Sequence, residues 1–197
     1  MNKNVKKATQ IYRKYEDTER LLIEVALDHY EDIFNEWDPA PFKRRDIDQD
    51  LRAFLEECSE EISIRHPIVI AFYLPKGELD DEKQEKCVEG LRSFFTFNKH
   101  LTSKELRLSY RQVLRHFLTG LAFLAVAVLF ERQLEKTMLL ELLDQGLFVG
   151  GWVFVWEALT IVAFRNQKLK HRIAEWNRFL DAPIIFKKER QREEELD

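Results

Sequence analysis

The chain has 197 residues and a mass of 23.6 kDa, with 34% charged residues, 45% apolar residues and a mean hydropathy of −0.39. These averages are typical of one soluble domain or one small domain with an appendage, and 31 basic against 35 acidic residues exclude a polycationic nucleic-acid binder. Two cysteines, Cys58 and Cys87, form neither a zinc-binding pattern nor a disulfide framework, so no metal or cofactor is expected.

The N-terminal region begins with a polar, basic segment, residues 1–20, which lacks the apolar core of a secretory signal. Residues 21–27 (LLIEVAL) fit either a strand or the start of a helix that continues to Phe34. We favour the strand, because a sheet with only two strands is marginally stable. Residues 37–42 (WDPAPF) contain two prolines, which predicts an ordered extended turn.

A helix is predicted over residues 47–62, with Asp46 as its N-cap. Its apolar positions share one face: Ile47, Leu51, Phe54, Leu55, Cys58 and Ile62. The acids Asp46, Asp48, Asp50 and Glu57 also match four positions of a calcium-binding loop. That loop needs glycine where this chain has Leu51, so the helix start is the better interpretation.

The next elements are a strand and two helices. Residues 68–74 (IVIAFYL) predict a buried strand, and Asp80 or Asp81 can cap the helix that follows. Residues 102–105 (TSKE) fit a capping box, which predicts a fresh helix start. Near the C-terminus, residues 169–180 predict an amphipathic helix, residues 183–186 a short strand that could pair with residues 67–70, and residues 187–197 a charged tail.

Charge is distributed unevenly along the chain. Residues 117–164 carry only seven of the 66 charged side chains. Within them, residues 117–130 have no charge and residues 146–164 have only Glu157. A membrane-spanning helix needs about 20 apolar residues. The second run meets this length, and the first meets it if Val113 and Leu114 are included; a buried helical hairpin in a soluble domain is the alternative.

The charges that flank the two runs favour the membrane. Residues 99–116 and 165–178 each carry five basic residues and one acid, whereas the connecting residues 131–144 carry two bases and four acids. This is the asymmetry of a hairpin whose outer flanks are cytoplasmic. We therefore predict a multi-pass inner-membrane protein with spans at about 113–131 and 145–164 and with both termini in the cytoplasm. Residues 21–112 and 165–186 would form a cytoplasmic α+β domain with two or three short strands.

Candidate functional residues lie mostly in and beside the spans. Glu157, near the middle of the second span, predicts either a proton or cation site shared by several copies or a polar contact to Thr119 or a neighbouring subunit. The helix-packing candidates are Gly146 and Gly150, a GxxxG pair, together with Trp152 and Trp156. Candidates for contact with lipid headgroups are Arg107, Arg111, Arg115, Arg165 and Lys168.

Two segments carry a resemblance to a known family. They are "IFNEWDPAPFKRRDID" and "GGWVFVWEA", and they resemble an uncharacterised family of small prokaryotic membrane proteins, a domain of unknown function with a DPxPFxxRDLD-like segment. The resemblance implies a soluble α+β part and a two-helix hairpin, and no activity. The matching positions are Ile33, Phe34, Asp38, Pro39, Pro41, Phe42, Arg45, Asp46, Asp48, Trp152, Val153 and Trp156.

Three functions follow as hypotheses. The leading one is a membrane-tethered scaffold, regulatory or assembly module that binds copies of itself or another protein, without nucleic acid. The second is an oligomeric channel or transporter subunit that uses Glu157, since two spans cannot enclose a pathway alone. The third is a membrane-bound enzyme, although the sequence carries no catalytic signature and names no catalytic residue.

Overall fold

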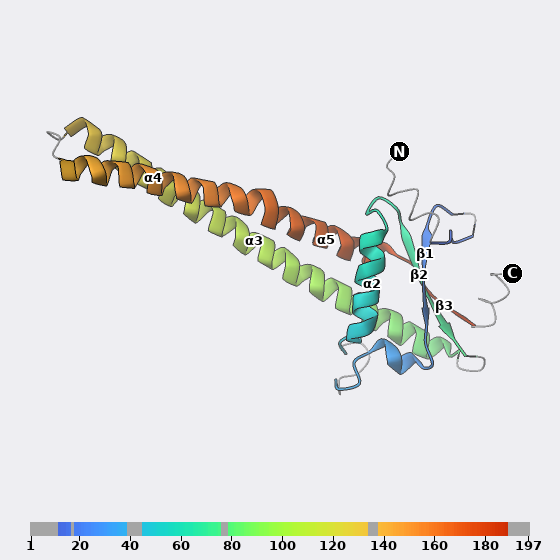
Figure 1. Cartoon of the computed structure of the whole chain (residues 1–197). Helices are drawn as coiled ribbons and strands as arrows, with labels where there is room; N and C mark the ends of the chain where they lie inside the picture. The colour runs from blue at the N-terminus through green and yellow to red at the C-terminus, as the bar shows by residue number, and fades with distance from the viewer. Residues whose placement is uncertain (1–11, 17, 39–44, 76–78, 134–137, 189–197) are drawn as a thin grey trace. The chain divides into compact units, whose positions relative to one another are not determined.

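The computed structural model describes all residues except 1–11, 17, 39–44, 76–78, 134–137 and 189–197. The chain divides into a sheet unit, Met1–His100 with Ala174–Asp197, and a helical unit, Leu101–Ile173. The elements in chain order are β1 (Leu21–Ala26), a 3-10 helix η1 (Tyr30–Ile33), α2 (Gln49–Glu61), β2 (Ile68–Leu74), α3 (Asp81–Gln133), α4 (Met138–Thr160), a π-helix η2 (Ile161–Arg165), α5 (Asn166–Asp181) and β3 (Ile184–Lys188) (Figure 1).

The described part of the sheet unit contains a three-stranded sheet in the order β1-β2-β3. Leu21 lies opposite Ile68 in one pair and Ile70 opposite Ile184 in the other, and both pairs are parallel. All seven residues of the central strand β2 are buried, which explains its unbroken apolar sequence. The predicted strands in residues 21–27 and 68–74 are confirmed, as is the pairing of residues 183–186 with the segment around residue 70.

Alternate strand residues point to opposite faces of this sheet. One face carries Ile23, Ile70 and Phe72 and is covered by residues of α2, α3 and α5, including Leu55 and Phe95. Phe95 stacks on Phe179 of α5 with ring centroids 5.2 Å apart. The second face carries a smaller cluster that consists of Leu22, Val69, Ala71 and Tyr73, with Tyr15 and Ile185 packed against it.

Helix α2 and its cap both begin two residues later than predicted. Asp48, and not Asp46, is the N-cap: its carboxylate accepts the backbone N–H groups of Asp50 at 2.9 Å and Leu51 at 3.1 Å. Asp46 is held in the preceding segment, where its N–H donates to Asp38 Oδ2 at 2.9 Å. Ile47 forms an isolated bridge with Phe34, which keeps this residue extended and outside the helix.

Helix α3 begins at Asp81, and the carboxylate of Asp80 accepts the N–H groups of Glu82 and Lys83, which confirms the predicted cap. The predicted fresh start at residues 102–105 is wrong, because α3 continues without a break to Gln133. Residues 91–119 contain no proline or glycine, so nothing interrupts the helical hydrogen bonds for a capping box to replace.

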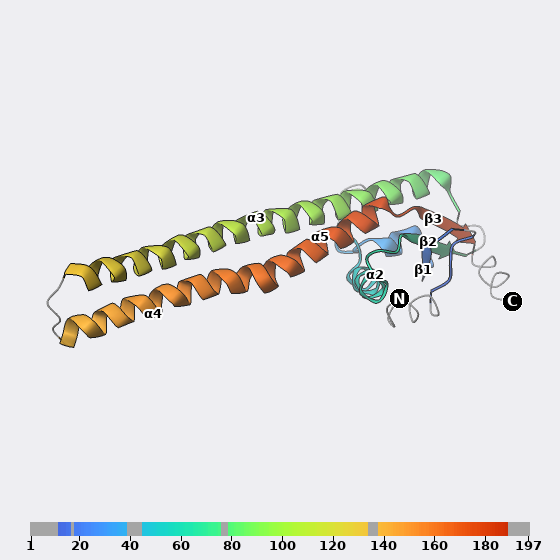
Figure 2. The same ribbon diagram turned by 90° about the horizontal axis from the view of Figure 1, so that it is seen from above.

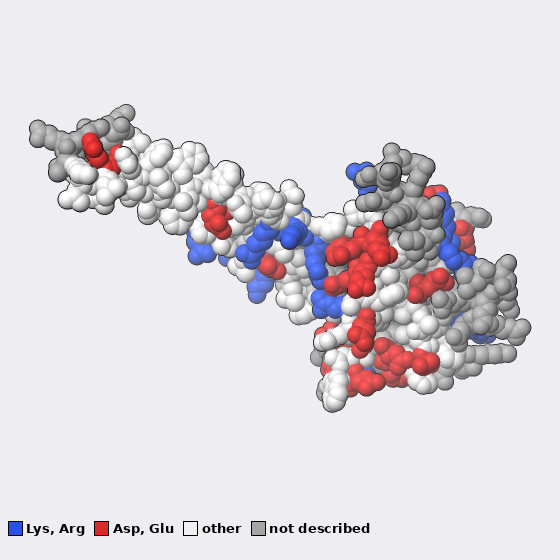
Figure 3. All heavy atoms as spheres, in the orientation of Figure 1, with Lys and Arg blue, Asp and Glu red and all other residues white. Residues whose placement is uncertain are grey.

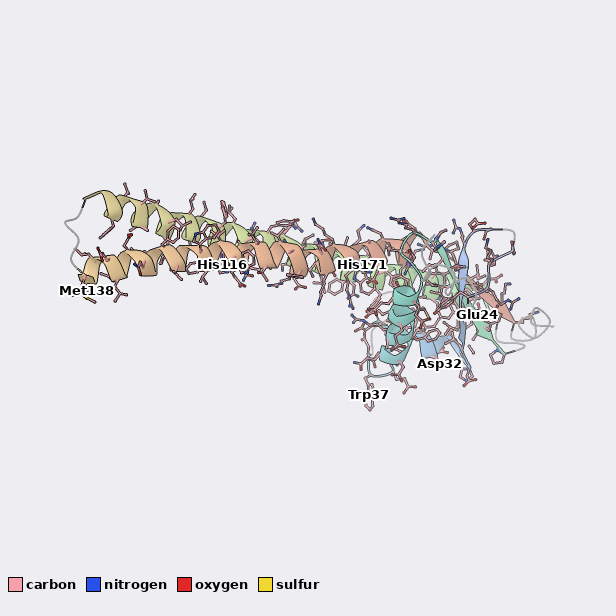
Figure 4. The ribbon with its side chains drawn as sticks, turned by 45° about the horizontal axis from the view of Figure 1, so that its top comes forward. Glu24, Asp32, Trp37, His116, Met138 and His171 are labelled. Atoms are coloured by element: carbon pink, nitrogen blue, oxygen red, sulfur yellow. The ribbon has the colours of Figure 1, made fainter. Side chains whose placement is uncertain are left out.

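Two predicted segments lie largely outside the described residues. Of the extended turn at residues 37–42, the structure describes Trp37 and Asp38; Trp37 is 91% exposed and points away from the sheet unit (Figure 4). Of the charged tail, Lys187 and Lys188 belong to β3, and residues 189–197 are not described.

Candidate functional site

Among the residues that the structure describes, two helices are long and apolar enough to cross a membrane. Within the most apolar 18-residue segment of each helix, only 11% and 17% is buried, so most of this apolar surface faces outward from the protein. The outward-facing side chains that are at least half exposed include Leu118, Leu121, Leu129, Phe148, Val149, Trp152, Val153, Trp156, Leu159 and Phe164. Figure 3 shows this stretch as a surface nearly without Lys or Arg, next to a cluster of basic side chains.

Helices α3 and α4 lie side by side in the helical unit (Figures 1 and 2). Most of the buried residues of the helical unit, where α3 packs against α4, η2 and the start of α5, are small. They are Ser109, Gly120, Ala127, Gly151, Ala158 and Asn166, with Ile161 as the larger exception. A Cβ added to Gly120 would lie 2.8 Å from the carbonyl oxygen of Gly151. The two backbones therefore approach closely at this point, as small residues also permit in membrane helix pairs.

The predicted packing residues of α4, which are Gly146, Gly150, Trp152 and Trp156, do not form this close contact with α3. A Cβ added to Gly146 would meet nothing within 4 Å, and one at Gly150 would contact only the ring of Phe123, at 3.5 Å. Trp152 and Trp156 are 52% and 69% exposed. The close contact inside the pair thus belongs to Gly120 and Gly151, whereas Gly146 leaves open space for a second copy, which stays a prediction.

Glu157 lies on the exposed surface of α4. It forms no hydrogen bond with Thr119 among the contacts that the structure describes. Since seven residues make almost two helical turns, Glu157 and Gly150 share one side of the helix. An ionised carboxylate is costly within a bilayer, so at such a depth Glu157 would be protonated, paired or facing a polar surface.

All five predicted headgroup-contact residues, Arg107, Arg111, Arg115, Arg165 and Lys168, are exposed. Arg165 is the best positioned of them: it donates to Gln112 Oε1 at 3.2 Å and pairs with Glu105 Oε1 at 3.4 Å. Lys170 lies over the ring of Tyr110, 5.8 Å from its centre. The structure therefore brings bases from both helices to one stretch of the helical unit.

A π-helix, Ile161–Arg165, precedes α5 and changes which residue faces α3. Ile161 is buried between the helices, and the next buried residue is Asn166, five positions on instead of the three or four of an α-helix. Ser109 Oγ donates to Asn166 Oδ1 at 2.6 Å. This bond was not predicted, although its two partners are polar residues that flank the two apolar runs.

In the sheet unit, Arg178 of α5 closes the C-terminal end of α2. Its guanidinium donates to the carbonyl oxygens of Ile62 at 3.0 Å and Ser63 at 3.1 Å, and to both oxygens of Ser59. The carbonyl oxygens of Ser59 and Ile62 are among those that a helix end leaves without an intrahelical partner. Burial lowers the pKa of Arg178 and nearby Glu175 opposes that shift. Its role is structural.

A cavity of about 380 Å³ lies beside Arg178 at the amino ends of the three strands. Arg20 precedes β1, Pro67 precedes β2 and Ala182 precedes β3. The other polar side chains that line it are Arg65, His66, Asn177 and Asp181. The lining carries both positively and negatively charged side chains, and it offers no pair of a nucleophile and a base. The cavity therefore indicates no particular reaction.

The two cysteines are buried in the sheet core. Burial raises the pKa of the Cys87 thiol to about 12, and it also raises the pKa of Cys58. Thiols of this kind are inert. Within the described ranges, no group of three His, Cys, Asp or Glu side chains could hold a metal ion.

No protein-family model, curated protein or solved structure matches the chain. The resemblance to the uncharacterised hairpin family therefore stays a prediction. Of its motif residues, Pro39, Pro41 and Phe42 lie outside the described residues, while Phe34 and Asp48 hold the start of α2 in place.

Proposed function

We propose that the chain is an integral membrane protein, with α3 and α4 as a transmembrane hairpin that tethers the sheet unit to the cytoplasmic face as a scaffold, regulatory or assembly module. One observation carries the proposal: in the helical unit the small residues face inward and the large apolar ones face outward. A soluble protein buries such residues in its core, whereas a membrane protein exposes them to lipid.

The exposed area also argues against a soluble helical hairpin. Soluble proteins rarely expose continuous apolar patches larger than a few hundred Å². Here the outward-facing leucines, phenylalanines, valines and tryptophans continue along both helices. The basic flanks and acidic connection supply the orientation, since Lys and Arg accumulate on the cytoplasmic side of membrane helices.

Membrane insertion and orientation are tested together. A reporter fused after Gln133 is expected to be external, and one fused at Asp197 cytoplasmic. The protein should also stay in the membrane fraction after alkaline carbonate extraction. A cytoplasmic signal from both fusions would refute the hairpin, and release by carbonate would refute the anchor.

The scaffold function has a separate test. Purification of the full chain in mild detergent, with mass measurement and identification of bound proteins, should show a homo-oligomer or a stoichiometric partner. A strictly monomeric sample without a co-purifying protein would contradict the scaffold function while leaving the anchor intact.

Glu157 supports a second candidate, an oligomeric channel or transporter subunit. It is the single ionisable residue of residues 146–164 and lies on the exposed side of α4. Several copies could place their carboxylates around one pathway. Proton and cation flux in proteoliposomes should then fall in Glu157→Gln; unchanged flux would remove this candidate.

A further inference from the structure

A cavity of about 580 Å³ lies in the helical unit, where the charged flanks meet the apolar runs. Arg115 and Arg165 line it, and they are the bases adjoining the uncharged residues 117–130 and the apolar residues that end at Phe164. If the apolar runs span the bilayer, this cavity is at the depth of the lipid phosphates on the cytoplasmic side.

The polar wall of the cavity is basic and held in position. Arg111, Arg115 and Arg165 line it from two helices, together with Gln112. Arg165 belongs to the π-helix and is oriented by hydrogen bonds to Gln112 at 3.2 Å and Glu105 at 3.4 Å. Since an oriented guanidinium loses less freedom when it binds, this geometry favours one bound anion over loose ionic contact.

A buried polar contact fastens the two helices beside this cavity. Ser109 lines it and is 1% exposed, and its hydroxyl donates to the equally buried Asn166 at 2.6 Å. Asn166 directly follows the π-helix. The extra residue of the π-helix thus puts Asn166 between the helices and leaves Arg165 outside, at the cavity.

The remaining walls are apolar. Leu108 and Leu114 line the cavity and are 52% and 56% exposed. A small hydrophilic anion would leave these leucines in water, whereas an amphiphile covers them while its phosphate meets the arginines. The cavity is lined by three guanidinium groups and by no carboxylate among its described lining residues. Arg165 is paired with the carboxylate of Glu105, which does not line the cavity, so the net charge of the lining favours an anion.

We propose that this cavity binds one anionic phospholipid, with its phosphate on Arg111, Arg115 and Arg165 and its glycerol and upper acyl carbons against Leu108 and Leu114. The proposal rests on the membrane anchor proposed above and adds a specific site to it. Arg107 and Lys168 carry the same charge on the same helices but do not line the cavity, which separates a site from general attraction to the membrane surface.

The test compares matched variants of the purified full chain by native mass spectrometry in detergent, with phosphatidylglycerol and phosphatidylcholine titrated separately. The first phosphatidylglycerol should bind more tightly than phosphatidylcholine. Arg165→Gln and Arg115→Gln should each weaken it about tenfold, the effect of one lost charge-assisted contact. Arg107→Gln and Lys168→Gln should change it less than about twofold. Equal losses in all four variants would overturn the site in favour of a diffuse basic surface.

Two further measurements distinguish a failure of the lipid site from a failure of the membrane anchor. Excess inorganic phosphate should not displace phosphatidylglycerol; full displacement would assign the arginines to a free anion and overturn the lipid. Arg165→Gln should remain in the carbonate-resistant membrane fraction and keep the wild-type far-UV circular dichroism spectrum. Release of the wild-type protein by carbonate would instead refute the anchor on which the site depends.

Discussion

Gly120→Ala is the most direct test of the close approach inside the helical unit. The new methyl carbon would lie 2.8 Å from the carbonyl oxygen of Gly151 and 2.9 Å from Val155 Cγ2. Carbon atoms pack best at about 3.5 Å or more. The oxygen belongs to the backbone of α4 and cannot rotate away, so the helices must separate locally by roughly half an ångström or more.

The energetic cost follows from this overlap. Overpacking a closely packed interface costs about 1–3 kcal/mol, and the better helix propensity of alanine returns up to about 1 kcal/mol. Gly146→Ala gains the same propensity without any overlap, because its Cβ would meet nothing within 4 Å. The difference between the two variants should therefore be about 1–3 kcal/mol, with Gly120→Ala the less stable.

Amide hydrogen exchange of the full chain in mild detergent, measured by mass spectrometry on peptides from α3 and α4, reads this difference locally. Exchange near residue 120 should be about 5- to 150-fold faster in Gly120→Ala than in Gly146→Ala. Equal protection in both variants would refute the contact. Gly151→Ala is a second check, because its Cβ would lie 2.7 Å from Leu124 Cγ and 3.1 Å from the carbonyl oxygen of Gly120. Adding Leu124→Ala should therefore relieve the larger part of this clash and should not relieve Gly120→Ala.

Two predictions concern the sheet unit. Arg178→Met should lower the free energy of unfolding by at least about 3 kcal/mol, because it removes the charged hydrogen bonds at the end of α2. In the same denaturant titration the control Arg52→Met, which breaks a partly exposed ion pair with Glu56, should lower it by less than about 1 kcal/mol. Equal losses of stability in the two variants would contradict the role of Arg178. The stability contributed by the protonated Cys87 thiol is fully present below pH 9.0 and is lost as the pH rises toward about 12, since only the unfolded thiol ionises in that range. The free energy of unfolding of Cys87→Ala should lack this part of the pH dependence. Parallel pH profiles of the wild-type protein and the variant would show that the thiol is not buried.

Patterns confined to one element were predictable from the sequence. The continuous apolar residues 68–74 predicted β2, and residues 21–27 were expected to form a strand in preference to a helix, which β1 confirms. Asp80 was one of the two acids expected to cap α3. Each of these signals depends on spacing within a few residues. The cap of α2 was placed two residues early because several acids fit it locally, and only the bridge between Phe34 and Ile47 decides among them.

Apart from the pairing of residues 183–186 with β2, features that depend on partners far along the chain were not predictable. Gly120 looks like an isolated glycine in an apolar run until Gly151 is placed opposite it, whereas the GxxxG spacing drew attention to Gly146, which has open space around it. The π-helix has no composition of its own, so the pairing of Asn166 with Ser109 could not be foreseen. The parallel direction of the strands likewise depends on connections that periodicity does not reveal.

The strand order has a consequence for biogenesis. The central strand β2 needs β3 along one edge, and residues 75–183, which include both long helices, are synthesised between them. During translation β2 therefore keeps an unpaired apolar edge until the ribosome has passed Lys188, and such edges bind other chains. The sheet unit can be completed only after the two long helices have left the ribosome, so any step that acts on those helices as they emerge precedes folding of the sheet.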